Sequence, residues 1–359
     1  MSLFHAYCHL ESGPIEFDPA DAQVFYDDAS GYLVVYRDGT FFVSPVHSRE
    51  IQAQKIDFIR RAPVIGVRFS MDKRHVAVQR SHTDVDVINL LDRSEVTVSC
   101  KGKGQGNMVH GFFWCNTSLC DIVLVTLTGV ELLKASSGSG DPYKLVKHDK
   151  RPICWYHYLH QARLLVLCTG KDYGTIQCFQ FAPSKLIKLP DFDPEQGSNG
   201  RRARLEGRDF VPCRLYDKLC CLQISAARQE LIVYQLGQGA IGRLCTINLF
   251  TSSDNFTVSV LDSLLVVHGS DSRITMIFDI RLHQWTSHPI VAPLPLGGPP
   301  PEGAEGGGGG EGGEGLLFSP AEQVVKDWQV TIPRHSFLDT LDYTLYAILS
   351  TLYTIHYAL

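Results

Sequence analysis

Three groups of residues have a spacing that could support catalysis or ligand binding. Gly102, Gly104 and Gly106 form a G-x-G-x-G run, which resembles the glycine-rich loops that hold phosphate groups. No Lys-Ser or Lys-Thr pair follows this run, no helix pattern opens behind it, and the third glycine of a dinucleotide fingerprint is missing. The run is therefore typical of a loop between β-strands rather than of a nucleotide site.

Histidine and aspartate pairs give an equally weak catalytic signal. His157 and His160 are three residues apart at the end of a strand-like run, where their side chains do not share a face. Asp84 and Asp86 alternate with valines and share one strand face, as general acid–base pairs can, but a solvated face explains them more simply. His110 and His148 lie elsewhere, so a metal site would require the fold to gather distant histidines.

Nucleophilic catalysis has no recognisable motif. The sequence has no G-x-S-x-G elbow, and no cysteine pair has the C-x2-C spacing of a zinc or redox site. Most of the eleven cysteines lie in or beside apolar runs, where a thiol behaves as a small hydrophobic group. We predict reduced, buried thiols, no catalytic residue, no metal and no cofactor.

Composition narrows the class of protein. The 359 residues are 44% hydrophobic and carry a formal net charge of −5, which argues against a dedicated nucleic-acid binder. Residues Met1–Phe17 contain His5, His9, Glu11 and Glu16 and lack the apolar core of a signal peptide. The expected compartment is the cytoplasm.

A repeated pattern of strands and turns gives the strongest structural signal. Tight turns recur at separations of 43, 46, 43, 57 and 45 residues, near Asp28, Met71, Thr117, His160, Asp217 and Asp262. A period of about 40–45 residues with four strands per unit is the signature of a β-propeller blade. The sequence therefore predicts an all-β, WD40-like propeller with six blades over residues 1–294.

The second unit shows the pattern most clearly. Strands are predicted at 64–69, 76–80, 85–90 and 96–98, with short turns between them. The third unit repeats it at 112–114, 122–125, 130–133 and 145–146. Residues 164–167 are apolar throughout, as in a strand that is covered on both faces.

Two segments interrupt the pattern. The long separation before Asp217 contains residues 190–208, with Arg201, Arg202, Arg204 and Arg208, and predicts a solvated loop between blades. Contact of these arginines with an acidic partner or anionic lipid is the alternative. Residues 295–315 are rich in Gly, Pro and Glu and predict a flexible linker.

The tail, residues 316–359, contains too few strand-like runs for a complete seventh blade, although 316–318 and 324–332 could form part of one. Apolar residues then recur at helical spacing, at Leu338, Leu341, Leu345, Leu349, Leu352, Ile355 and Leu359. This favours a short amphipathic helix. A membrane anchor is the alternative, but only 17 residues follow Asp342 and no Lys or Arg flanks them.

Several of the strands resemble one known family, the regulator subunit of the Mon–Ccz complex. Coverage runs from about Tyr7 to Leu294. The residues that carry the resemblance include Phe69, Ser70, Ala77, Val78, Gln79, Arg80, Trp114, Trp155, Tyr156, His268, Phe278 and Asp279. The Ala77–Arg80 core after Phe69-Ser70 is its most specific part.

The resemblance implies a role but no catalytic residue. It implies a WD40-like domain in a non-catalytic subunit of a Rab guanine-nucleotide exchange complex, which acts in late-endosome maturation, lysosomal fusion and autophagy. The implied partners are the Mon–Ccz subunits and, through them, a late-endosomal Rab GTPase and the late-endosomal or lysosomal membrane. The family's helical C-terminal half has no counterpart after Gly315, so we expect either a truncated form or a genuine short protein.

Two alternatives remain open at this stage. A generic vesicle-tethering or coat propeller would show the same pattern, whereas a propeller enzyme would need acids or histidines converging from several innermost strands. Unpaired strand edges are expected in the first and last blades, where a partner strand could add. These edges are Phe41, Phe42 and Val43, and Ile274, Thr275 and Ile277; closure by the chain's own ends, at residues 1–17 or 324–332, is the alternative.

Overall fold

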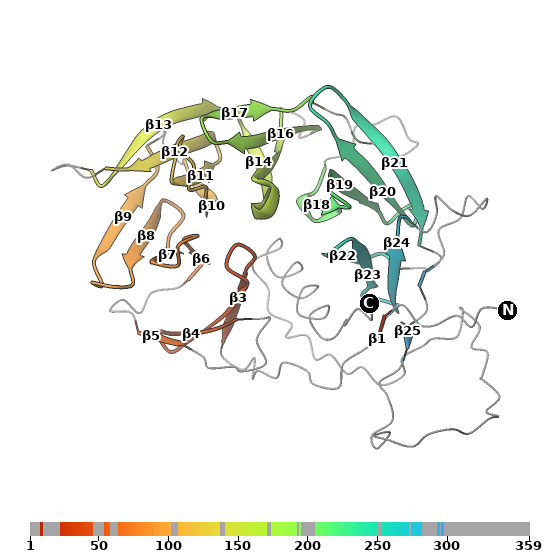
Figure 1. The fold of residues 1–359 in the computed structure, drawn as a ribbon, viewed down its shortest axis with the longest axis horizontal. Helices are drawn as coiled ribbons and strands as arrows, with labels where there is room; N and C mark the ends of the chain where they lie inside the picture. The colour runs from red at the N-terminus through yellow and green to blue at the C-terminus, as the bar shows by residue number, and fades with distance from the viewer. Residues whose placement is uncertain are drawn as a thin grey trace, which may run out of the picture. The chain divides into compact units, whose positions relative to one another are not determined.

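The computed structural model contains six successive antiparallel sheets (Figure 1). It describes residues 8–9, 22–45, 54–57, 64–101, 107–136, 141–170, 174–191, 194, 205–249, 251, 253–272, 274–281, 293–294 and 296–297. Five of these sheets have four strands, and the sixth has three. The predicted all-β propeller with six blades is confirmed.

In each sheet the strands follow one another in chain order. The first sheet contains β2 (Gln23–Asp27), β3 (Tyr32–Arg37), β4 (Thr40–Pro45) and β5 (Gln54–Asp57). The second contains β6 (Gly66–Phe69), β7 (His75–Gln79), β8 (Asp84–Asn89) and β9 (Glu95–Ser99). The third contains β10 (Val109–Trp114), β11 (Ile122–Thr126), β12 (Gly129–Ala135) and β13 (Tyr143–Lys150).

The remaining sheets repeat this order. The fourth contains β14 (Ile153–Leu159), β15 (Leu164–Thr169), β16 (Thr175–Ala182) and β17 (Lys185–Lys188). The fifth contains β18 (Phe210–Leu215), β19 (Lys218–Ser225), β20 (Glu230–Leu236) and β21 (Ile241–Asn248), and the sixth β22 (Phe256–Leu261), β23 (Leu264–Gly269) and β24 (Ile274–Asp279). Short 3-10 turns, η1 (His160–Ala162) and η2 (Gly207–Asp209), precede β15 and β18, and β1 (Cys8–His9) pairs in parallel with β25 (Leu296–Gly297).

The chain divides into two compact units. The larger consists of Asp18–Gln223 and Ile232–Leu244 and contains the first four sheets and most of the fifth. The smaller consists of Met1–Phe17, Ile224–Leu231 and Cys245–Leu359 and contains the sixth sheet and the β1–β25 pair. The predicted boundaries at 294 and 315 remain predictions, because 298–359, with the expected linker and helix, lies outside the described residues.

The recurring turns have a common backbone feature. They join the first two strands of a sheet, and several place a non-glycine residue at positive φ, namely Lys73, Asn116, Arg163, Asp217 and Asp262. Between β18 and β19, both Tyr216 and Asp217 have positive φ, as in the two-residue turns that match the twist of a hairpin. This shared geometry explains the repeat that the sequence shows.

The second strands are apolar because each sheet packs between two neighbours. All five residues of β11 are buried. Val123 and Val125 pack toward the fourth sheet, whereas Ile122 and Leu124 pack toward the second. Successive side chains on a strand point to opposite faces, so a strand covered on both faces needs apolar residues at every position.

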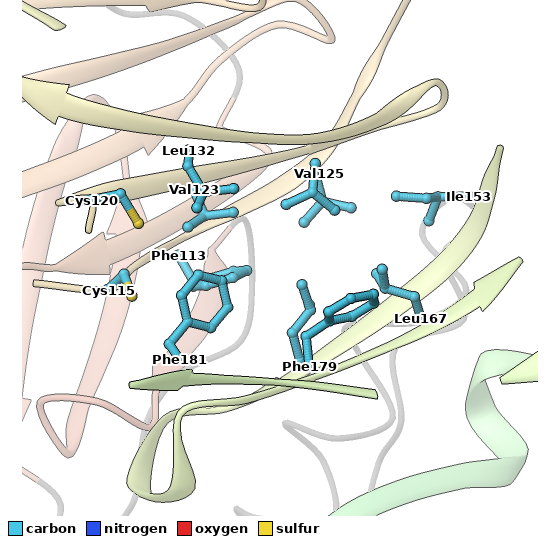
Figure 2. Close-up of a cluster of buried hydrophobic side chains, with 12 residues drawn as sticks. Phe113, Cys115, Cys120, Val123, Val125, Leu132, Ile153, Leu167, Phe179 and Phe181 are labelled. Carbon is cyan, nitrogen blue, oxygen red and sulfur yellow. The ribbon is translucent and has the colours of Figure 1, made fainter. Parts of the chain in front are cut away.

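The core between the third and fourth sheets shows this packing directly. Figure 2 shows side chains of the two sheets facing one another, among them Phe113, Leu132, Leu167 and Phe181. The ring of Phe113 stacks on Tyr158 with a centroid separation of 3.6 Å and meets Phe181 edge-on. Aromatic pairs of this kind add to the free energy gained from apolar burial.

Candidate functional site

The first strands of the larger unit carry a group of charged residues that the sequence analysis did not recognise. Asp27 ends β2 and is fully buried, and Arg68 lies on β6 of the next sheet. Arg68 Nη1 lies 2.6 Å from the carboxylate of Asp28 and 3.5 Å from that of Asp27. The first two sheets are thus joined by an ion pair shared among three side chains.

Asp27 accepts further hydrogen bonds across this boundary. The Ser30 hydroxyl donates to it at 2.6 Å, and the backbone N–H of Phe69 donates from the second sheet at 3.0 Å. Burial raises the pKa of the Asp27 carboxyl, and Arg68 and the hydrogen bonds oppose that rise. Burial also acts to lower the pKa of Arg68, but Asp28 and Asp27 raise it above the usual arginine value.

Tyr156 of β14 belongs to the same region. A side chain at Gly111 of β10 would overlap the Tyr156 hydroxyl, so the tyrosine lies directly over that glycine. Burial raises the pKa of Tyr156, and Arg68 opposes the rise. Burial lowers the pKa of nearby His160, whose charge the two aspartates favour. Charged and phenolic groups from three sheets therefore influence one another.

The residues that carry the family resemblance form many of the ties between sheets. Gln79, which is 2% exposed, donates from Nε2 to the carbonyl of Val109 at the start of the third sheet, at 3.0 Å. Trp114 Nε1 donates back from the third sheet to the carbonyl of Arg68 in the second, at 3.1 Å. The second and third sheets are therefore joined by one side-chain hydrogen bond donated from each of them.

The same arrangement joins the fourth and fifth sheets. Trp155 Nε1 donates to the carbonyl of Leu205 at 2.8 Å, and His157 Nε2 lies 2.7 Å from the carbonyl of Gly207. His157 lies against η2, and His160 lies within η1. Neither histidine takes part in a metal cluster, and no group of three or more candidate ligands occurs among the described residues.

Other residues of the resemblance organise single sheets. Ser70 accepts from the N–H of His75 and donates to Asp72, which closes the turn between β6 and β7. Ala77, Val78 and Phe278 are completely buried. Arg80 pairs with Asp86 at 3.3 Å, His268 contacts the Thr275 hydroxyl at 2.9 Å, and Asp279 accepts from the N–H of Arg281.

The strand face of Asp84 and Asp86, which the sequence predicts to be solvated, is solvated only in part, because Asp86 is buried. Asp84 accepts from the hydroxyls of Ser99 and Thr83, whereas Asp86 is buried against Arg80 and the Thr97 hydroxyl. These hydrogen bonds join β8 to β9 and to the turn that precedes β8. The glycine run at 102–106 lies outside the described residues, as do Arg201, Arg202 and Arg204.

The predicted burial of the cysteines is confirmed for seven of the ten that are described, and these ten form no disulfide. The seven are Cys115, Cys120, Cys168, Cys178, Cys213, Cys220 and Cys221. Burial raises the pKa of Cys178 to about 12, and it also raises the pKa of Cys213 and Cys221. A thiol with a raised pKa is a poor nucleophile at neutral pH.

One of the two predicted strand edges is wrong. Phe41, Phe42 and Val43 lie on β4, which pairs with β3 on one side and β5 on the other. The polar sequence of β5, Gln54–Asp57, hides the fourth strand of this sheet from a search for apolar runs. Because both sides of β4 are paired, no partner strand can add there.

The second predicted edge, β24, is the last strand of its sheet among the described residues. It carries Ile274, Thr275 and Ile277, and its inner side pairs with β23. The carbonyl of Ile277 accepts a hydrogen bond from the N–H of Leu294 at 2.7 Å, and the Leu294 side chain packs on the same sheet. The chain itself therefore covers part of this edge, with a residue that lies in neither of the two segments, 1–17 and 324–332, that were expected to close it.

Backbone direction shows which residues of β24 present their N–H and C=O groups away from β23. In an antiparallel pair the N–H and C=O of one residue point to the same side, and this side alternates along the strand. The backbone carbonyl of Ile277 points away from β23, toward Leu294. The backbone N–H and C=O of Thr275, two residues earlier, therefore point away from β23 as well. Thr275 is thus the candidate position for a partner strand.

The six successive antiparallel sheets, and the side-chain hydrogen bonds that join neighbouring sheets, define a WD40-like β-propeller. Residues 24–139 match the family model described as "Regulator of MON1-CCZ1 complex, N-terminal". The Regulator of MON1-CCZ1 complex of Mus musculus is 28% identical over 295 residues, which cover 77% of this chain and 44% of the mouse protein. The Homo sapiens regulator matches to the same extent. The Dictyostelium discoideum homolog is 26% identical over 274 residues, which cover 76% of this chain and 26% of the Dictyostelium protein.

These matches confirm the predicted resemblance to the N-terminal part of the Mon–Ccz regulators. The chain spans less than half the length of the curated relatives that it matches. Solved structures with a similar arrangement include the Myceliophteria thermophila Cps50 (Swd1) propeller domain, at 13% identity and a TM-score of 0.46 over 71% of this chain and 82% of that one. Kluyveromyces lactis Hsv2 is 14% identical, with a TM-score of 0.43 over 72% of this chain and 81% of the Hsv2 chain.

No helix among the described residues is long and apolar enough to cross a membrane. The tail with the predicted amphipathic pattern lies outside those residues, so the choice between helix and anchor stays a prediction.

Proposed function

We propose that the chain acts as a non-catalytic subunit that binds the MON1–CCZ1 complex. The observation that carries this proposal is the similarity to curated regulators of that complex over 295 residues. The similarity covers 77% of this chain rather than one motif. A propeller suits such a role because its rigid sheets present loops that can vary without changing the core.

The finer role follows from the same resemblance. In this proposal MON1–CCZ1 exchanges the nucleotide of a late-endosomal Rab GTPase, and the chain supports it during endosome maturation, lysosomal fusion and autophagy. The chain is cytoplasmic and reaches late endosomes and lysosomes through its partners. A generic tethering propeller is the competing class, and binding to MON1–CCZ1 separates the two.

The enzyme alternative finds little support in the charged group on the first strands. Arg68 pairs with both Asp27 and Asp28, and Asp27 is fully buried and bonded to the second sheet. These groups hold two sheets together. The arrangement therefore favours a structural use of the charges over catalysis.

Binding to the complex can be tested with the full chain. Tagged chain should retain the purified MON1–CCZ1 dimer on a resin, whereas an unrelated WD40 propeller should not. Equal retention by both propellers, or by neither, would contradict the proposal.

The open position on β24 gives a sharper version of this test. Thr275→Pro removes an N–H that points away from β23, so the β23–β24 pairing should persist. Thr275→Val is the matched control, because it keeps the backbone N–H and removes the hydroxyl that contacts His268. If a partner strand adds at this edge, only the proline variant should retain less MON1–CCZ1 dimer. Unchanged retention by a folded proline variant would rule out binding at this edge but would leave the proposed subunit role standing.

A further inference from the structure

The outer strand of the third sheet has an unusual surface. β13 is the last strand of its sheet and exposes two aliphatic side chains, Leu145 at 40% and Val146 at 49%. Three lysines on the same strand, Lys144, Lys147 and Lys150, are also exposed. We call these five residues the β13 rim.

The positive charge of the β13 rim is not balanced by its neighbours. Asp141 pairs with Lys101, and Asp149 pairs with Arg151. Of the other nearby acids, Asp121 accepts a hydrogen bond from the N–H of Ala135, and Glu131 is buried and accepts one from the N–H of Lys101. Among the residues that the structure describes, the three lysines of the rim form no ion pair, and all three are exposed, Lys144 and Lys147 on one face of the strand and Lys150 on the other.

A β-bulge shapes the rim. The register with β12 pairs Leu133 with Leu145 and then Leu132 with Lys147, so Val146 is the extra residue. The bulge brings Lys144 and Lys147 to the same face of the strand, opposite Lys134 and Leu132. Bulges and lysines are also the devices by which edge strands resist the addition of another strand.

Other outer strands of the larger unit differ in charge. β9 has the acidic Glu95 at its exposed end, and on β17 Lys188 pairs with Asp191 at 2.9 Å. The whole chain carries a formal net charge of −5, which opposes any general attraction to an anionic surface. Binding of such a surface would therefore have to be local, and on β13 positive charge and exposed aliphatic groups occur on one strand.

We propose that the β13 rim docks directly on an anionic phospholipid bilayer. Lysines near an anionic leaflet are attracted to it, and aliphatic side chains between them can enter the boundary between headgroups and acyl chains. A bilayer fits this bulged edge better than an extended acidic peptide, which would need a regular edge for strand pairing. The inference goes beyond the proposed function, in which the chain reaches membranes through its partners.

The test is flotation of the full chain with vesicles of stated composition. Binding is expected to vesicles of phosphatidylcholine mixed with phosphatidylserine, to fall as salt rises, and to be much weaker with phosphatidylcholine alone. The triple variant Lys144→Gln/Lys147→Gln/Lys150→Gln should lower the partition coefficient by about 100-fold, since each lysine contributes on the order of 1 kcal/mol. Leu145→Ser/Val146→Ser should lower it by a smaller factor that salt does not change.

A matched control removes three exposed positive charges elsewhere, with Arg93→Gln/Lys185→Gln/Lys218→Gln, and should retain binding. If the triple rim variant does not fold, Lys144→Gln/Lys147→Gln is the substitute, with a loss of about 20-fold or more. Equal losses in rim and control variants would overturn the proposal. So would absence of vesicle binding, or rim-dependent binding of a polyglutamate peptide without vesicle binding. Retention of MON1–CCZ1 by the rim variant is expected to be unchanged.

Discussion

Two boundaries within the larger unit both contain an apolar layer, but the first adds a buried charged tie to that layer. Between the first and second sheets, Arg68 bridges Asp27 and Asp28, and Asp27 binds the backbone of Phe69. Between the third and fourth sheets, the contact is an apolar layer centred on Phe113, Tyr158 and Phe181 (Figure 2).

The difference concerns how each boundary responds to change. An apolar layer gains its stability from buried area and close packing, which depend little on pH but strongly on side-chain volume. A buried ion pair depends on both partners and fixes one orientation, and loss of one partner leaves an uncompensated group. The blades of one propeller therefore differ in what breaks them, although their backbones repeat.

The largest expected loss comes from the apolar boundary. Phe113→Ala removes a ring that is 1% exposed and should lower the free energy of unfolding by about 3–5 kcal/mol. Urea unfolding measures this change. Leu91→Ala, at a position that is 78% exposed, is the control and should change stability by less than about 0.5 kcal/mol. A loss at Phe113 as small as that of the control would show that this layer does not hold the sheets together.

The charged boundary should be the next most sensitive. Asp27→Asn keeps the shape of the side chain but removes its charge and one acceptor, and should cost about 1–3 kcal/mol in urea unfolding. Asp38→Asn is the matched control, because Asp38 is exposed and asparagine tolerates its positive φ of 52°. An equal effect of the two substitutions would remove the case for a charged tie.

A single polar tie should matter less than either boundary. Gln79→Met preserves length and removes the N–H donors to the carbonyls of Val109 and Ser81. The expected cost is about 1 kcal/mol, measured by thermal unfolding, against no loss for Gln23→Met on the exposed side of β2. Undiminished stability of the Gln79 variant would show that apolar packing alone joins the second and third sheets.

The pH dependence gives the smallest effect. Burial raises the pKa of Asp209, beside the tie of His157 to Gly207, to about 6. A carboxyl with a raised folded-state pKa takes up its proton in the folded protein first, so its contribution favours folding as the pH falls from 7 through 6 toward 4. Asp209 is partly exposed, so the gain should be on the order of 1 kcal/mol or less. Comparison of the unfolding free energy of wild type with that of Asp209→Asn, at pH 7 and at pH 4.5, isolates this contribution. If the wild type loses stability relative to the variant when the pH falls, the raised pKa of Asp209 is refuted.

Local patterns explain why so much of the fold could be predicted. Alternation and turn residues act within a few positions, so strands such as β8 and the turn at Tyr216–Asp217 can be recognised in the sequence. The polar strand β5 lacks that pattern, which is why the edge at Phe42 was mistaken. The Asp27–Arg68 tie joins residues 41 positions apart, and only the charge of Arg68 within an otherwise apolar strand could have drawn attention to it.

The most direct test of the central claim measures nucleotide release from the late-endosomal Rab GTPase loaded with fluorescent GDP. The chain alone should leave the intrinsic release rate unchanged, whereas the MON1–CCZ1 dimer should accelerate release and retain the chain in a stable complex when the three are mixed. Acceleration by the chain alone, or a dimer that works without ever binding the chain, would contradict the account of a non-catalytic propeller subunit.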